Sequence, residues 1–190
     1  FRVSLGKSTD EVLFDTGDGG FYSLNNENFN RLQPLGVLDI KSRGFGSASW
    51  SAGGKEKSSR KYRAMFHELT VDKSTFLHVV TETGNGGHSR IGAGLLKYGI
   101  VTLDFPGKKF WYQSYEDGKK DIKEDKWNMQ IITGPENTLI IGCVWDSARS
   151  LVRGGEQIIA INRKTIGKID PCDMFTNSHN LGIEGEEVLL

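Results

Sequence analysis

One hexapeptide constrains the fold of this chain more than any other stretch. This hexapeptide, Val12-Leu13-Phe14-Asp15-Thr16-Gly17, consists of three apolar residues followed by a carboxylate, a hydroxyl and a glycine. The apolar run predicts a strand, and the glycine predicts a tight turn at its end. Such a strand carries the Asp15 carboxylate into a turn. An aspartate placed in this way usually caps its own turn, and catalysis is the alternative role.

The surrounding residues extend the β pattern. Residues 2–5 and 11–14 predict a hairpin that delivers Asp15, and residues 21–24 predict a short strand. A helix is expected from Asn25 or Asn26, either of which could cap it, to about Leu32. Further strands are predicted over the segments 61–69 and 76–81. The front of the chain is therefore expected to be mainly β.

The hexapeptide resembles the active-site loop of the pepsin and retropepsin-like aspartic protease family. In that family a later motif of two apolar residues and a glycine passes behind the loop, and Arg90-Ile91-Gly92 stands in that place here. The run from Ile91 to Tyr112 resembles the closing short helix and hairpin of the family. The resemblance implies an acid-protease-like β-barrel lobe over residues 1–115.

The same resemblance implies Asp15, Thr16 and Gly17 as the catalytic residues. Two positions depart from the family pattern. Asp18 stands where Ser or Ala is usual, and a second carboxylate so near the first would raise its proton affinity. Arg90 stands where an apolar residue is expected. Both departures bear on catalysis more than on the fold.

Hydrolysis in this family needs two aspartates that share a proton, and this chain offers one. The resemblance therefore implies a peptide or protein substrate and a second Asp-Thr-Gly lobe. That lobe would be a homodimer partner or an upstream region of a longer protein; the abrupt start at Phe1 favours the upstream lobe. A third interpretation is a catalytically inactive peptide-binding or scaffolding protein that keeps the fold. No cofactor is implied.

Glycine and serine are frequent between residues 41 and 61. In the family a mobile hairpin near this position folds over the substrate, and glycines beside aromatic residues suit such a lid. Phe45 and Trp50 are the candidate lid residues. A plain flexible loop is the alternative interpretation.

A charged stretch over residues 116–126 predicts a linker. The segment 127–190 then resembles a small β-rich PDZ domain with one or two helices, most specifically in Gly-Glu-Gln-Ile-Ile-Ala-Ile-Asn at 155–162. The resemblance implies strand-addition peptide binding. Because the usual Gly-Leu-Gly-Phe loop is absent, the domain could instead only brace the first lobe. The peptide-binding residues implied are Trp127, Asn128, Met129, Gln130 and Met174.

The bulk composition limits the partners. The 24 basic residues balance the 24 acidic ones, which argues against nucleic acid and anionic membranes as partners. No apolar run approaches the roughly 20 residues of a membrane span. The four histidines are isolated, so no metal site is predicted, and Cys143 and Cys172 are as consistent with buried thiols as with a disulfide. The combination of lobes resembles bacterial proteins of the Bacteroides type and implies a periplasmic or extracellular location.

Overall fold

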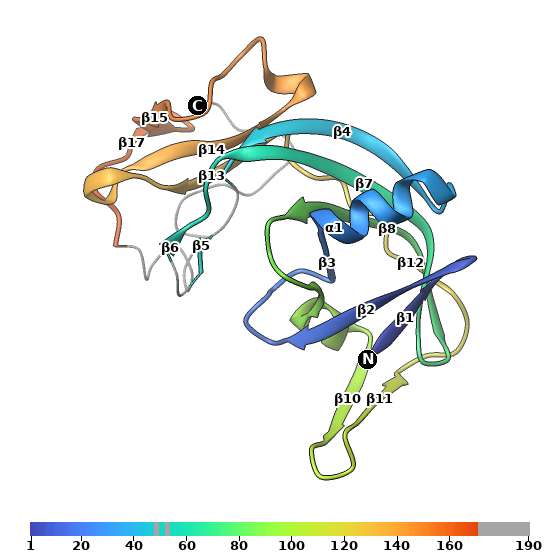
Figure 1. Cartoon of the computed structure of the whole chain (residues 1–190). Coiled ribbons are helices and arrows are strands. Elements are labelled where there is room, and N and C mark those ends of the chain that lie inside the picture. Colours follow the sequence, from blue (N-terminus) through green and yellow to red (C-terminus); the bar gives the residue numbers. More distant parts are fainter. Residues whose placement is uncertain (48–49, 52–53, 171–190) are drawn as a thin grey trace. The chain divides into compact units, whose positions relative to one another are not determined.

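The computed structural model describes residues 1–47, 50–51 and 54–170. The chain divides into two compact units. The first unit comprises Phe1–Arg43 and Lys61–Lys126, and the second comprises Gly44–Arg60 and Trp127–Leu190. Strands dominate the described residues of both units, which confirms the prediction of a mainly β chain (Figure 1).

The first unit is built around a closed sheet. Because β7 pairs with both β1 and β8, six strands in the order β8-β3-β9-β2-β1-β7 close into a barrel. The elements of this unit are β1 (Arg2–Leu5), β2 (Ser8–Asp15), β3 (Tyr22–Asn25), α1 (Asn26–Leu32), η1 (Gln33–Leu35), β4 (Leu38–Gly46), β7 (Ser59–Val71), β8 (Ser74–Gly84), β9 (Ser89–Gly92), η2 (Ala93–Lys97), β10 (Gly99–Asp104), β11 (Lys109–Ser114) and β12 (Lys120–Asp121). The strands β4 and β7 continue into the second unit.

Alternating apolar residues fill the barrel. Along β2, Asp10 and Val12 are buried whereas Glu11 and Leu13 are exposed, because successive side chains of a strand point to opposite faces. Asp15 and Leu13 therefore share the outer face. The main buried side chains of this core are Val3, Leu5, Val12, Tyr22, Leu24, Leu32, Phe66, Leu69, Val71, Phe76, Val79, Ile91 and Leu95.

The helix α1 forms where the sequence predicts it. The Asn25 side chain accepts a hydrogen bond from the backbone N–H of Asn28 at 2.8 Å, which caps the first turn. Glu27 lies in the first turn and Arg31 in the last, as the helix dipole favours. Its buried face, which includes Phe29, packs into the core of the first unit.

The segment predicted as a linker is bound to the first unit. Its short strand β12 pairs in parallel with β8, and Lys119 forms an ion pair with Glu68 at 3.0 Å. Close to the end of the unit, the guanidinium of Arg63 donates to the carbonyl oxygen of Lys126 at 3.2 Å. These are polar and backbone contacts, so the low apolar content of the segment did not predict them.

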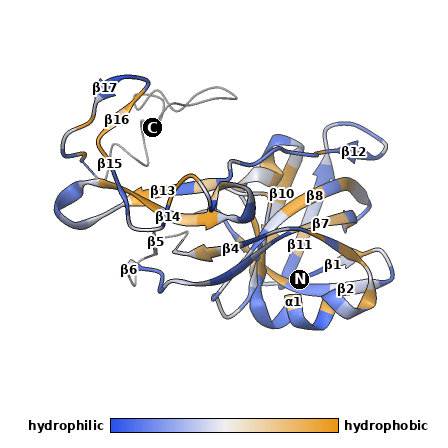
Figure 2. Cartoon of the chain, turned by 90° about the horizontal axis from the view of Figure 1, so that it is seen from above, coloured by the Kyte–Doolittle hydropathy of each residue, from blue (hydrophilic) through white to orange (hydrophobic). Residues whose placement is uncertain are grey.

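The second unit centres on β14, which is buried along its whole length and largely hydrophobic (Figure 2). This strand pairs with β13, with β15 and with the end of β4. The segment 44–60, assigned from sequence to the first lobe, thus contributes to this unit. Its further elements are β5 (Trp50–Ser51), β6 (Gly54–Lys55), β13 (Met129–Thr133), η3 (Pro135–Asn137), β14 (Leu139–Trp145), η4 (Asp146–Ala148), β15 (Gln157–Ile158), β16 (Ala160–Ile161) and β17 (Lys164–Thr165).

Candidate functional site

The two sequence motifs lie side by side in the first unit. Strand β2 pairs in parallel with β9, in a register that sets Leu13 opposite Arg90 and Asp15 opposite Gly92. Asp15 is the last residue of β2, and Gly92 is the last residue of β9. Both strands therefore end at the same level, and the turn after Asp15 lies against the residues that follow Gly92.

Three backbone hydrogen bonds fix the turn that follows Asp15. The N–H groups of residues 92, 93 and 94 donate to the carbonyl oxygens of Phe21, Asp18 and Gly20, at 3.1, 2.7 and 3.0 Å. A Cβ at Gly92 would overlap two of these oxygens, those of Asp18 and Gly20. The glycine of the second motif is therefore required by the close approach of the Asp15 turn.

Gly92→Ala is expected to destabilise the chain by about 1–3 kcal/mol, because the added methyl group must displace the backbone of the Asp15 turn. The matched control is Gly84→Ala, since a Cβ at Gly84 meets no heavy atom within 4 Å. Urea unfolding of both variants measures the difference. Equal stability of the two variants would contradict the packing described for Gly92.

Asp15 combines a fixed position with access to solvent. Its Oδ1 accepts a hydrogen bond from the backbone N–H of Gly17 at 3.0 Å, so the side chain caps its own turn. The Asp15 side chain is nevertheless 42% exposed, and Thr16 and Gly17 are exposed as well. The carboxylate is thus oriented by its turn while its other oxygen faces Arg90 and solvent.

The two departures from the family pattern meet at one place. The Nε of Arg90 lies 3.5 Å from Oδ2 of Asp15 and 3.3 Å from Oδ2 of Asp18. The guanidinium therefore lies between two carboxylates that would otherwise repel each other. The sequence suggested that Asp18 and Arg90 are separate irregularities, whereas the structure makes them one ion-paired cluster with Asp15.

Asp18 is held in its ionised form. Burial raises the pKa of its carboxyl, but three interactions outweigh burial and place the pKa below its usual range. The Ser23 hydroxyl donates at 2.6 Å, the Gly20 N–H donates at 2.9 Å, and the Arg90 guanidinium adds a hydrogen bond and a positive charge. Ser23 was not predicted as a site residue.

The lowered pKa of Asp18 predicts a specific acid sensitivity. Because the folded state binds the Asp18 proton less tightly than the unfolded state, the carboxylate stabilises the fold above its ordinary, unfolded pKa of 3.8. That contribution is lost as the pH falls through the lower, folded pKa. Asp18→Asn should therefore destabilise the chain at pH 6 more than at pH 2.5, as measured by urea unfolding. A pH-independent difference would contradict this assignment.

A serine that precedes the second motif joins the site to α1. The Ser89 hydroxyl accepts hydrogen bonds from the Asn25 backbone N–H at 3.2 Å and from the Asn28 side-chain amide at 3.0 Å. Asn25 also donates to the carbonyl oxygen of Gly87 at 3.1 Å. The helix cap thus supports the strand that carries Arg90. The polar residues at 25–28 predicted a helix cap, but they did not predict its hydrogen bonds to Ser89.

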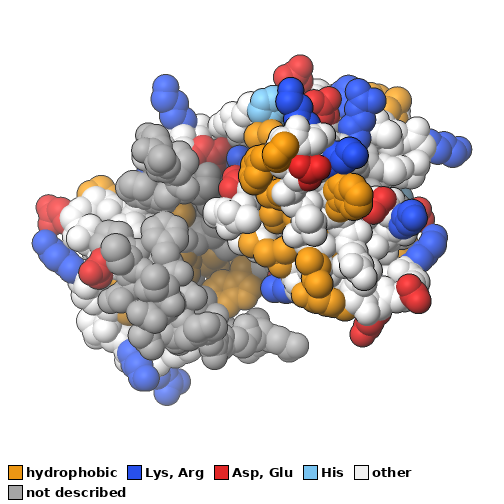
Figure 3. Space-filling model, turned by 90° about the horizontal axis from the view of Figure 1, so that it is seen from below, with side chains coloured by type: hydrophobic (Ala, Val, Ile, Leu, Met, Phe, Trp, Pro, Cys, Tyr) orange, Lys and Arg blue, Asp and Glu red, His pale blue; other side chains and the backbone are white. Residues whose placement is uncertain are grey.

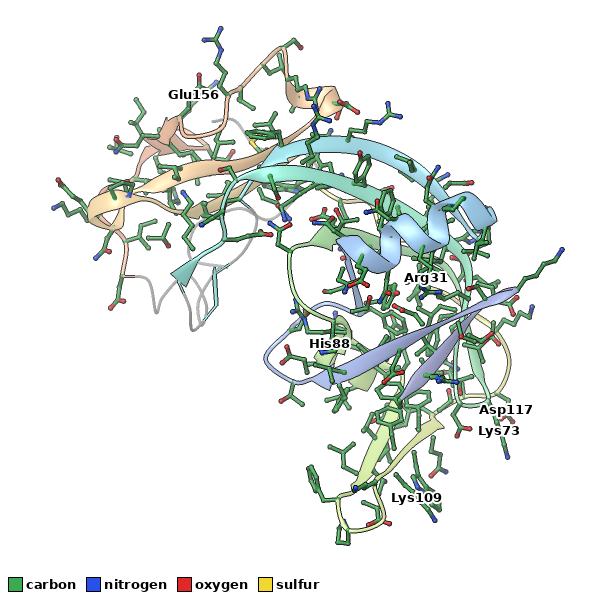
Figure 4. The ribbon with its side chains drawn as sticks, in the orientation of Figure 1. Arg31, Lys73, His88, Lys109, Asp117 and Glu156 are labelled. Carbon is green, nitrogen blue, oxygen red and sulfur yellow. The ribbon has the colours of Figure 1, made fainter. Side chains whose placement is uncertain are left out.

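The hairpin of β10 and β11 has one face against the core and one face toward solvent. On the buried side, Phe110 stacks on Phe1 with ring centroids 3.8 Å apart, and Tyr112 reaches the core. On the other face, Ile100 and Trp111 are both more than half exposed. Figure 3 views the molecule from below, the side on which Figure 1 shows this hairpin, and it shows apolar side chains gathered on the first unit. Figure 4 labels Lys109 beside the turn of the hairpin.

The lid and peptide-binding predictions fall in the second unit. Phe45 is 57% exposed near the end of β4, and the Trp50 backbone pairs with β6. The backbone carbonyl oxygen of Asn128 accepts a hydrogen bond from the backbone N–H of Trp145 at 2.9 Å, and β13, which includes Met129 and Gln130, pairs with β14. Trp127 is half-buried, and Met174 lies outside the described residues. Their roles in binding stay predictions.

Within the described ranges no group of three His, Cys, Asp or Glu side chains is placed to hold a metal ion. The helices of those ranges are also too short or too polar to cross a membrane. Cys143 is buried in the second unit, and Cys172 lies outside the described residues.

No protein-family model matches the chain, and no curated protein matches it. Among solved structures, the chain is similar to a retropepsin-like aspartic protease from Rickettsia conorii. The two share 17% sequence identity with a TM-score of 0.39, and the match covers 55% of this chain and 74% of that chain.

Proposed function

We propose that the first unit is one lobe of an aspartic peptidase and that Asp15 is one of its two water-activating carboxylates. The observation that carries the proposal is the parallel pairing of β2 with β9, which places Asp15 opposite Gly92. The partial exposure of Asp15 supports access to a substrate. The turn hydrogen bond from Gly17 supports a fixed orientation of the carboxylate.

The chemistry requires a second carboxylate. In a pair of close aspartates only one ionises readily, so one takes a proton from water while the other donates a proton to the peptide carbonyl. Asp18 does not fit the second role, since its side chain is only 17% exposed and its two oxygens accept hydrogen bonds from Gly20 and Ser23. The second aspartate is therefore proposed to come from another Asp-Thr-Gly lobe.

That lobe would be an upstream region of the same protein or a second copy of this chain. The exposed side chains of Ile100 and Trp111 on the outer face of the β10–β11 hairpin support such a partner, because exposed large apolar side chains are common at interfaces. Phe105, at the tip of the hairpin, is 81% exposed. A symmetric dimer would supply Asp15 twice.

The second unit is proposed to be PDZ-like and to bind peptide in an extended conformation. Its strand β13 pairs with β14 and is the last strand in the order of the described sheet. Peptide binding there would follow the strand-addition mode of PDZ domains. A bacterial source and a periplasmic or extracellular location remain part of the proposal, from the resemblance alone.

A catalytically inactive binding or scaffolding protein is the second candidate. The observation that favours it is Arg90, whose Nε lies 3.5 Å from the Asp15 carboxylate. A cation held there competes with water and with a second aspartate for the same oxygen. Under this alternative the fold is retained and the chain binds peptides without cleaving them.

The test begins with the mass of the chain in solution, measured by light scattering at several concentrations. If the chain dimerises, it should cleave an unfolded protein at mildly acid pH and be blocked by a statine-type inhibitor. If it is monomeric, the same activity is expected only from the longer protein that includes the upstream lobe. An inactive dimer together with an inactive longer protein would favour the scaffolding candidate.

A further inference from the structure

The second unit contains a cavity of about 430 Å³ that is separate from the residues predicted to bind peptide. Its described lining comes from the end of β4, from the β6 segment, from β14 and from the loop that follows η4. None of residues 127–130 lines it. Its volume falls in the range of sites that hold small ligands or a few peptide residues.

The floor of the cavity is a hydrogen-bonded backbone. The N–H of Ser47 donates to the carbonyl oxygen of Gly142 at 3.0 Å, and the N–H of Gly155 donates to that of Ile141 at 2.7 Å. Gly46 has a φ of 143°, and a Cβ there would overlap the Gly142 carbonyl oxygen. The backbone of Gly46 therefore packs directly on the backbone of Gly142, at a distance that only glycine permits. These fixed contacts make this part of the cavity a pre-formed surface.

Several apolar side chains line the cavity. Phe45 lines the cavity although 57% of its surface is exposed, and Val152 lines it from the loop after η4. Ile140 and Val144 contribute from β14. An exposed phenylalanine beside aliphatic side chains offers a contact for one apolar side chain of a ligand.

The charged side chains of the described lining are Lys55, Arg149 and Arg153, and all three are cationic. Arg149 forms an ion pair with Asp146 at 3.1 Å. The Glu156 carboxylate is directed back to the loop, where it accepts a hydrogen bond from the Arg153 backbone N–H at 2.9 Å (Figure 4). Neither of these acidic residues lines the cavity, but Arg149 is already ion-paired, so the positive charge offered to a ligand rests on Lys55 and Arg153.

We propose that this cavity binds an acidic peptide segment, in which an apolar side chain contacts Phe45 and flanking carboxylates pair with the cationic rim. Arg guanidinium groups favour carboxylates because two N–H donors match the two carboxylate oxygens. A peptide fits better than nucleic acid, because Lys55 and Arg153 line one cavity and do not form the long basic groove that tracks a nucleic-acid backbone. The site does not involve Asp15, so its occupancy is independent of peptidase activity.

The experiment uses the full chain and a short fluorescein-labelled peptide, Gly-Glu-Leu-Glu-Gly, blocked at both ends. Fluorescence anisotropy should show binding that weakens as salt is raised, since the contacts at the rim are ionic. The same peptide with Gln or Lys in place of Glu should bind at least about tenfold more weakly. Asp15→Asn should leave binding unchanged.

The variant pair isolates the rim charges. The double variant Lys55→Glu and Arg153→Glu should weaken peptide binding about tenfold or more. The control is the double variant Arg163→Glu and Lys164→Glu, which changes the net charge by the same amount at exposed positions outside the lining. This control should retain peptide binding. Thermal unfolding confirms that both double variants fold. Equal weakening by the two pairs, equal affinity for the Gln peptide, or binding only to anionic phospholipid vesicles would overturn the proposal.

Discussion

Asp15→Asn should lower the peptidase activity of the paired enzyme by a factor of about 10²–10⁴, the usual contribution of a general acid–base group. The amide has the same shape, and its oxygen still accepts the hydrogen bond that Gly17 donates at 3.0 Å. It cannot, however, take a proton from water or share one with a second aspartate. The loss should appear in kcat, measured on an unfolded protein substrate at mildly acid pH.

The matched control is Glu11→Gln. Glu11 lies on the same strand and the same outer face as Asp15, but its side chain is 77% exposed and its nearest cationic partner, Arg2, is 4.0 Å away. This control should retain full activity. Because Asp15 is 42% exposed, its variant should unfold within about 1 kcal/mol of the parent chain. Activity that survives Asp15→Asn would rule out Asp15 as a catalytic residue and would contradict the peptidase proposal.

Local patterns were sufficient for much of the first unit. The apolar run before Asp15 predicted the end of β2, and the polar residue Asn25 predicted the start of α1. Both depend on interactions between residues close in sequence, such as the bond from the Asn28 N–H to the Asn25 side chain. The pairing of Asp15 with Gly92 followed from the family resemblance rather than from periodicity, since residues so far apart in sequence leave no local signal.

Long-range polar contacts were not predicted. Arg90 was expected to be an irregularity in an apolar motif, and only the register of β2 with β9 shows that it meets Asp15 and Asp18. The segment 44–60 was assigned to the first lobe by its position in the chain, whereas its pairing with β14 contributes it to the second unit. Such contacts depend on which strands become neighbours, and that is a property of the topology.

A second long-range polar contact lies on the buried face of β2, the strand that ends at Asp15. The side chain of Asp10 is 1% exposed, and its two oxygens accept hydrogen bonds from the Tyr22 hydroxyl at 2.6 Å and from the Arg31 guanidinium at 3.0 Å. Burial and the Asp10 charge hold the pKa of Tyr22 well above its usual range, so the hydroxyl remains a donor. The Arg31 side chain reaches this carboxylate from α1 (Figure 4). The network therefore ties β2 to β3 and to the helix.

Asp10→Ala should destabilise the chain by about 2–3 kcal/mol, because it leaves the buried Tyr22 hydroxyl without its acceptor, while the loss of the half-exposed Arg31 pair adds little. Glu11→Ala, at the next position on the exposed face, should change the free energy of unfolding by less than about 0.5 kcal/mol. Urea unfolding at neutral pH measures both values. Similar costs for the two variants would show that the network does not hold the barrel together.

The double variant separates the two causes of that cost. Tyr22→Phe alone should cost about 1–3 kcal/mol, since it removes one hydrogen bond to a buried carboxylate. Combined with Asp10→Ala, it should add little or even restore stability, because the phenylalanine removes the donor that had lost its acceptor. Strictly additive costs would instead mean that Asp10 stabilises the fold through Arg31 alone. In that case β2 would be held by α1 rather than by β3, and the position of Asp15 would depend on the helix.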